Sequence, residues 1–202
     1  MAAPVYLMSG ARVLYAPVTA AKPSDHDVDY GAALTSWPTG WKDVGYTNKA
    51  TSLGFSQEKY DIDVQQSTIP LGSSVTSESA PLALGIVSFN SDNLLLAFPG
   101  SSAATTAASP TAKAVTVIGF GGAAIRDVWQ WCIEAGKKDD NNVTQPVRVY
   151  IHRGEAALDG EMALDKAKET AINLTVTPTV DTTKAPGYQM GEIHIVTSGK
   201  TA

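Results

Sequence analysis

A succession of short β-branched and aromatic segments, separated by turn-forming residues, constrains the fold of this 202-residue chain most strongly. The segments with this pattern are residues 12–18, 51–64, 75–87, 115–118, 128–133, 147–151, 172–180 and 193–196. Valine, isoleucine, threonine and aromatic residues favour extended backbone, and glycine and proline between them favour turns. Because the helical signals are few, we predict a mainly β fold, a sandwich or barrel of short antiparallel strands.

A long, protruding β-hairpin is predicted over residues 51–87. Its connection, residues 65–74, holds turn-forming residues, and Pro81 and Gly85 are expected to interrupt the return strand. The apolar residues of the connection are Ile69 and Leu71. Apolar side chains on the tip of a polar loop indicate a partner surface, so we expect this hairpin to mediate association between chains.

One short α-helix is predicted at residues 91–98, where polar residues precede a leucine-rich run that Pro99-Gly100 ends. Residues 101–114 are rich in Ser, Ala and Thr, which predicts a mobile loop. Residues 155–169 remain open between a helix and a hairpin, because helix-favouring side chains surround Gly160. We expect one domain over residues 1–202. Its parts are an N-terminal strand and arm (1–40), the hairpin, the helix, the loop and second-half strands (115–197).

Charge and composition exclude several classes of function. The formal net charge is −5, whereas proteins that grip nucleic acid are generally basic. A single cysteine, Cys132, rules out an internal disulfide framework. No apolar run approaches the roughly 20 residues that cross a bilayer, and Met1–Pro4 does not begin like a secretion signal. We therefore expect a soluble protein without membrane insertion.

The best indication of an enzyme is Gly119-Phe120-Gly121-Gly122-Ala123-Ala124, which fits the dinucleotide-binding pattern Gly-x-Gly-x-x-Gly/Ala. The pattern needs a strand before it and a helix after it, and the alternation around Trp129 and Trp131 predicts a strand instead. We therefore favour a glycine-rich turn. Residues 25–29 (Asp-His-Asp-Val-Asp) lack the spacing of a calcium loop and are expected to form a solvated loop, so no catalytic, cofactor or metal residue is assigned.

A more specific pattern lies in the first half of the chain. Gly40-Trp41-Lys42-Asp43-Val44-Gly45-Tyr46-Thr47 is followed by Leu53-Gly54-Phe55-Ser56-Gln57-Glu58 and by Asp61-Ile62-Asp63-Val64-Gln65-Gln66-Ser67. With the helix near residue 95 and the blocks at residues 160–164 and 172–178, this order resembles the major tail (tail tube) proteins of long-tailed bacteriophages.

The resemblance implies a structural subunit, not an enzyme, and no cofactor. Six subunits would form a ring, and stacked rings would form a hollow tube through which viral DNA passes without specific binding. The implied partners are further copies of the chain, a tape-measure protein, a tail terminator and tail-tip or baseplate proteins. The implied location is the virion tail, with assembly in the host cytoplasm. The resemblance also favours a hairpin at residues 155–169.

The same resemblance places the long hairpin at the tube lining and against neighbouring subunits. The hairpin strands contain four carboxylates, and we expect at least two of them to face the lumen: Glu58, Asp61, Asp63 and Glu78. Strand alternation puts Asp61 and Asp63 on one face and Glu58 on the other, so Asp61 and Asp63 are the preferred pair. The expected contacts between subunits are Gln65, Gln66, Ile69, Pro70 and Leu71.

Three other functions remain as alternatives. The first is the tube protein of a contractile or secretion-like injection system. The second is a dinucleotide-binding oxidoreductase that uses Gly119, Gly121 and Ala124. The third is a carbohydrate-binding β-sandwich of a phage tail tip.

Overall fold

The computed structural model describes residues 7–25, 27–62, 72–122, 126–139, 142–162 and 170–197. In these residues the fold is mainly β and antiparallel, with a single α-helix, as the sequence predicts. The strands are β1 (Leu7–Pro17), β2 (Lys42–Asp43), β3 (Ser52–Leu53), β4 (Ser56–Ile62), β5 (Gly72–Ser79), β6 (Leu82–Ile86), β7 (Ser102–Thr106), β8 (Val115–Gly119), β9 (Val128–Lys138), β10 (Thr144–Leu158), β11 (Ile172–Pro178) and β12 (Gly191–Ile195). The helices are the 3-10 turn η1 (Leu34–Ser36) and α1 (Ser91–Ala97).

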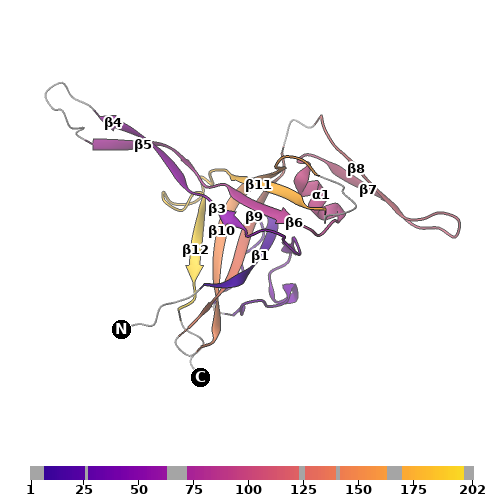
Figure 1. Cartoon of the computed structure of the whole chain (residues 1–202), viewed down its shortest axis with the longest axis horizontal. Helices are drawn as coiled ribbons and strands as arrows, with labels where there is room; N and C mark the ends of the chain where they lie inside the picture. Colours follow the sequence, from indigo (N-terminus) through magenta and orange to yellow (C-terminus); the bar gives the residue numbers. More distant parts are fainter. Residues whose placement is uncertain are drawn as a thin grey trace.

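The main sheet has the order β2-β1-β9-β10-β11-β6-β3, and its centre is the long strand β10 (Figure 1). One edge of β10 pairs with β9. The other edge pairs first with β12, from Val147 to Ile151, and then with β11, from Gly154 to Leu158. A register shift between Ile151 and Gly154 separates the two parts, and such irregularities let a strand bend.

This sheet curls back on itself around the main core. Three strands lie between β1 and β6 in the sheet order, yet Val13 of β1 and Leu84 of β6 belong to one buried cluster. Trp131 of β9 is fully buried in the same cluster. Leu96 of α1 also joins it, so the helix closes one side of the core. The two halves of the curled sheet therefore form the layers of the predicted sandwich.

The opposite face of the β1-β9-β10 sheet carries a second cluster. Leu14, Cys132 and Tyr150 point to this side, next in sequence to residues of the main core. Trp37 and Trp41, from the segment between β1 and β2, cover them. The alternation predicted for residues 128–133 is thus confirmed, because both faces of the sheet are packed.

The helix α1 begins at Ser91, as predicted, and ends at Ala97, one residue before the predicted end. Asn90 is the N-cap, and its side chain accepts a hydrogen bond of 2.8 Å from the backbone N–H of Asn93. The Asn93 amide is buried and donates to the backbone oxygens of Val44 and Ser88. These bonds fix the helix to the chain segment that follows β2.

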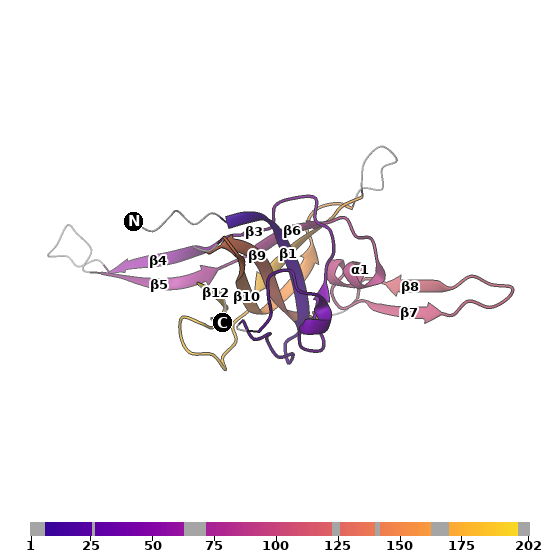
Figure 2. The same ribbon diagram turned by 90° about the horizontal axis from the view of Figure 1, so that it is seen from below.

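Two hairpins project from the body in opposite directions (Figures 1 and 2). The β4–β5 hairpin was predicted, and Pro81 separates β5 from β6 as expected, whereas Gly85 lies inside β6. The β7–β8 hairpin was not predicted: the loop expected at residues 101–114 contains β7, which pairs with β8 from Ser102 to Thr106. Small polar residues have weak strand propensity, so here the cross-strand partner decides the structure.

The open question at residues 155–169 is settled in its described part. β10 continues as a strand to Leu158, which pairs with Leu174 of β11. The residues from 163 to 169 lie outside the described range. In the described residues no helix has the length and apolar character needed to cross a membrane.

Candidate functional site

The β4–β5 hairpin presents both of its faces to solvent, since every residue of the two strands is exposed. Its register pairs Gln57 with Glu78, Lys59 with Val75 and Asp61 with Ser73. These residues form one face, which is charged and polar except for the exposed Val75. Glu58, Tyr60 and Ile62 alternate onto the other face. The register shifts between Glu58 and Lys59, and the unpaired residue at this shift is Thr76 of β5, so the alternation within β4 continues.

The carboxylates expected at the lumen lie in different environments. Glu58 accepts a hydrogen bond of 2.9 Å from the Ser77 hydroxyl, and Glu78 accepts one of 2.6 Å from the Gln57 amide. Asp61 lies farther out along the hairpin. Asp63 and the expected contact residues all lie outside the described residues: Gln65, Gln66, Ile69, Pro70 and Leu71.

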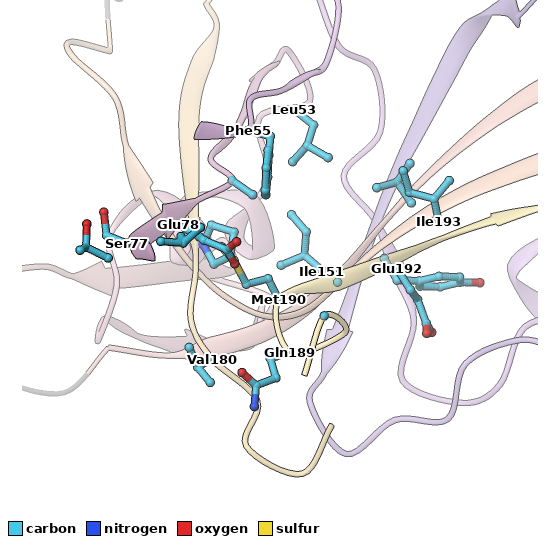
Figure 3. Close-up of a pocket in the computed structure, with 18 residues that line it drawn as sticks. Leu53, Phe55, Ser77, Glu78, Ile151, Val180, Gln189, Met190, Glu192 and Ile193 are labelled. Carbon is cyan, nitrogen blue, oxygen red and sulfur yellow. The ribbon is translucent and has the colours of Figure 1, made fainter. Parts of the chain in front are cut away.

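At the base of this hairpin an open groove of about 650 Å³ lies against the main sheet (Figure 3). Its floor is formed by Val149 and Ile151 of β10 and Ile193 of β12. Leu53 and Phe55 line the hairpin side of the groove, opposite Ile151 (Figure 3). The remaining lining residues come from β5 and the residue after it, from β10, from the end of β11, from the segment after β11 and from β12: Val75, Thr76, Ser77, Glu78, Ala80, Tyr150, Pro178, Val180, Gly187, Gln189, Met190, Gly191 and Glu192.

Several large apolar side chains of this groove are exposed, which sets it apart from a closed core. Phe55 is 66% exposed and Ile193 is 61% exposed, and Leu53, Val75 and Val180 are exposed as well. Contiguous apolar surface of this kind indicates an interaction site. Sequence reasoning missed it because its residues come from four separate segments, although the alternation of Ile193 and Ile195 in a strand was a signal.

The β7–β8 hairpin carries a second apolar surface on one of its faces. Ala104 pairs with Val117, and Thr106 pairs with Val115. Val115 and Val117 are 52% and 60% exposed, so this valine face has no cover from the described part of the chain. Thr105 and Thr116 lie on the other face and share a hydrogen bond of 3.0 Å.

A buried ionic cluster fixes the segment after β1 to the sheet. The Arg148 guanidinium is fully buried and donates to the fully buried Glu134 carboxylate over 2.8 Å and to Asp25 over 2.7 Å. It also donates to the backbone oxygen of Val28 over 2.7 Å, and it lies over the ring of Trp37. Asp25 therefore takes part in an internal ion pair and Val28 is buried, whereas the sequence predicts a solvated loop at residues 25–29. Burial opposes the charged form of Arg148, but the hydrogen bonds to Asp25 and Glu134 outweigh it and raise the pKa.

A second ionic group extends this cluster towards β12. Glu192 pairs with Lys22 and, over 3.0 Å, with His194, which also pairs with Asp25. Burial raises the pKa of Glu192, but the hydrogen bond and charge of Lys22 lower it more, so the group stays ionised. Burial, followed by the charge of Lys22, lowers the pKa of His152, whose Nδ1 lies 3.1 Å from the Lys22 ammonium.

The structure does not support the dinucleotide motif. Gly119 ends β8, and Gly121 and Gly122 both have positive φ, 92° and 77°. The next described element is the strand β9, so no helix follows at residues 126–139 to receive a phosphate. Residues 123–125 lie outside the described range. Within the described residues, no three His, Cys, Asp or Glu side chains are grouped so that they could hold a metal ion.

A comparison with known families finds a match that covers most of the chain. The family model described as phage tail tube protein matches residues 5–190. This range begins just before β1 and ends immediately before β12, so it includes both hairpins. No curated protein matches the chain.

Proposed function

The chain belongs to the phage tail tube protein family, and from this premise we propose that six copies form a ring and that stacked rings carry viral DNA to the host. Membership in the family makes the chain a structural subunit of a virion tail that joins other tail proteins in a tube. The number of subunits, the stacking and the DNA passage are the proposed part. A ring closed by head-to-tail contacts leaves two faces free, and stacking on those faces gives a filament.

The observation that carries this proposal is the pair of exposed hairpins on opposite sides of the body (Figure 2). An isolated two-stranded hairpin is at best marginally stable in water, and exposed strand edges favour pairing with other chains. All residues of β4 and β5 are exposed in the single subunit. Neighbouring copies would pack against these strands and stabilise them.

We assign the outer part of the charged hairpin face to the lumen, with Asp61 and Asp63 as its carboxylates. Asp61 shares this face with Lys59, whereas the opposite face presents Tyr60 and Ile62 and suits a contact with protein. A lining that is not basic would not hold the DNA polyanion by counterion release, so the DNA would stay mobile. Glu58 lies on the other face and Glu78 lines the groove, so neither belongs to this assignment.

The proposed contacts between subunits are those at the hairpin connection: Gln65, Gln66, Ile69, Pro70 and Leu71. A tape-measure protein would fill the tube, and a tail terminator and tail-tip or baseplate proteins would cap its ends. Subunits would assemble in the host cytoplasm and remain in the virion. No catalytic step and no cofactor enter this function.

The experiment is electron microscopy of the purified protein at high concentration, where we expect six-fold rings or tubes. A variant that lacks residues 66–73, closed by a short turn, should stay folded because none of the core strands is altered, and it should form no tubes. Circular dichroism of both proteins checks the fold. Normal tubes from the shortened variant would show that the connection is not a contact, and a wild type that stays monomeric at every concentration would refute the tube.

A further inference from the structure

The valine face of the β7–β8 hairpin extends beyond the body of the subunit. Apart from the intermediate Ile118, all residues of the two strands are exposed, and the valines of β8 lie on one face with Ala104. The hairpin projects away from the β4–β5 side of the molecule in both views (Figures 1 and 2). A surface placed in this way can only be covered by another molecule.

The groove is lined by residues of β5, β10 and β12 at the base of the β4–β5 hairpin. The β7–β8 hairpin projects from the body in the direction opposite to β4 and β5 (Figures 1 and 2). The groove offers an apolar surface open to solvent, through its apolar floor and the exposed Phe55 and Ile193. Its volume of about 650 Å³ leaves room for several side chains, because a water molecule occupies roughly 30 Å³ of liquid. A subunit cannot reach its own groove with its own β7–β8 hairpin.

The charges of the two surfaces are complementary. Lys113 is the single charged residue among residues 102–119. Two charged residues line the groove, and both are acidic. Glu192 is already paired with Lys22 and His194 in the same subunit, so Glu78 carries the charge complementarity. Glu78 is exposed and is hydrogen-bonded to the neutral amide of Gln57, so it presents its negative charge to an incoming chain. Complementary potentials of this kind favour one partner and one orientation.

We propose that the β7–β8 hairpin of one copy docks with its valine face in the groove of the next copy. The occupant is a second copy of this chain because the hairpin and the groove match in apolar character and in charge, and because the hairpin projects away from β4 and β5, at whose base the groove lies. The contact is head-to-tail, so each docked copy leaves a free hairpin and a free groove for the next. It rests on the proposed self-assembly and adds a second contact to that of the β4–β5 connection.

The first test is cross-linking between single-cysteine variants. The native Cys132 is fully buried and does not compete for the reagent. Val117→Cys and Ile193→Cys are made in separate proteins, mixed, assembled and treated with a short bis-maleimide. We expect a cross-linked dimer from the mixture and none from either variant alone or from the wild type. A dimer from one variant alone would show a symmetric contact and would overturn the proposal.

The second test uses a matched pair of alanines. Ala104→Asp places a charge on the valine face, and Ala103→Asp places the same charge on the opposite face of the same strand. We expect Ala104→Asp to raise the concentration needed for assembly at least tenfold and Ala103→Asp to change it less than threefold. Both positions are exposed, and the melting temperature of the unassembled subunit checks the fold. Equal effects of the two variants would overturn the docking contact.

The outcomes separate this inference from the proposed function. If the wild type builds rings or tubes and the mixture of variants gives no cross-link, the docking contact is wrong and the tube stands. If the mixture cross-links while the wild type forms neither rings nor tubes, the contact stands and the tube is wrong.

Discussion

Replacement of the buried Arg148 by methionine should destabilise the subunit more than any change at an exposed side chain. The substitution keeps a long apolar side chain but leaves the Glu134 carboxylate, which is fully buried, without its closest positive charge. It also removes the donor to Asp25 and to the backbone oxygen of Val28. Removing one partner of a buried ion pair costs about 3–5 kcal/mol, so we expect a loss of about 4 kcal/mol in the free energy of unfolding.

Two other variants provide a comparison for this loss in free energy of unfolding. Glu134→Gln removes the charge but keeps an oxygen that accepts from Arg148, and we expect a loss of about 2 kcal/mol. Arg153→Met changes an arginine of the same strand that is only half-buried, and we expect about 0.5 kcal/mol or less. The expected order of the three losses in free energy of unfolding follows from how deeply each side chain is buried and from how many charged partners it has.

The measurement is urea denaturation of dilute, unassembled subunits, since assembly adds its own stabilisation. For a chain of this length, 4 kcal/mol corresponds to a fall of about 10 °C in the melting temperature. If Arg148→Met and Arg153→Met differ by less than about 1 kcal/mol, the cluster does not fix the segment after β1 and the reasoning is refuted.

Four further predictions follow from other parts of the structure. The pKa of His152 is lowered in the folded subunit, so its stabilising contribution is present above pH 6.5 and is lost as the pH falls below that value. The urea midpoint of unfolding should therefore fall as the pH is lowered, and His152→Gln should make the midpoint depend less on pH. Gly121→Ala should cost about 1 kcal/mol by strain alone, because its φ is 92° and no atom lies within 4 Å of an added Cβ. Burial raises the pKa of the Cys132 thiol, so a thiol-reactive dye should label it only in denaturant. Replacing Asp61 and Asp63 by lysine should leave tubes intact and slow DNA ejection, most strongly at low salt.

Each of these predictions has its own control. A pH curve that His152→Gln leaves unchanged would assign the titration to another group. Nicotinamide or flavin binding that disappears in Gly121→Ala would restore the cofactor hypothesis. Rapid labelling of Cys132 in the native subunit would show that β9 separates readily from the residues that cover it. A double Asp61/Asp63→Asn variant controls for lost side-chain contacts, and a double lysine variant that does not assemble would place these residues in an interface.

Short-range patterns in the sequence are enough to predict the class of the fold. Alternation around Trp131 predicts a strand with two packed faces, and the apolar run ended by Pro99 predicts the helix, because both signals arise from residues close together in the chain. The order of motifs from Gly40 to Ser67 indicated the tail tube family, which the match to residues 5–190 shows. The β4–β5 hairpin was also evident from its two extended segments and the turn between them.

How distant segments meet depends on long-range packing, which the sequence patterns do not indicate. Nothing local in the sequence indicates that β10 changes partner after Ile151, yet this change brings β6 opposite β1 and leaves the groove beside β12. The burial of Arg148 and Glu134 depends on a cover from residues 25–37, more than 90 residues away. β7 is a strand because β8 lies beside it, since Ser, Ala and Thr alone do not favour extended backbone enough. Packing between residues far apart in the chain therefore forms the surfaces that the proposed assembly uses, and no short-range pattern encodes that packing.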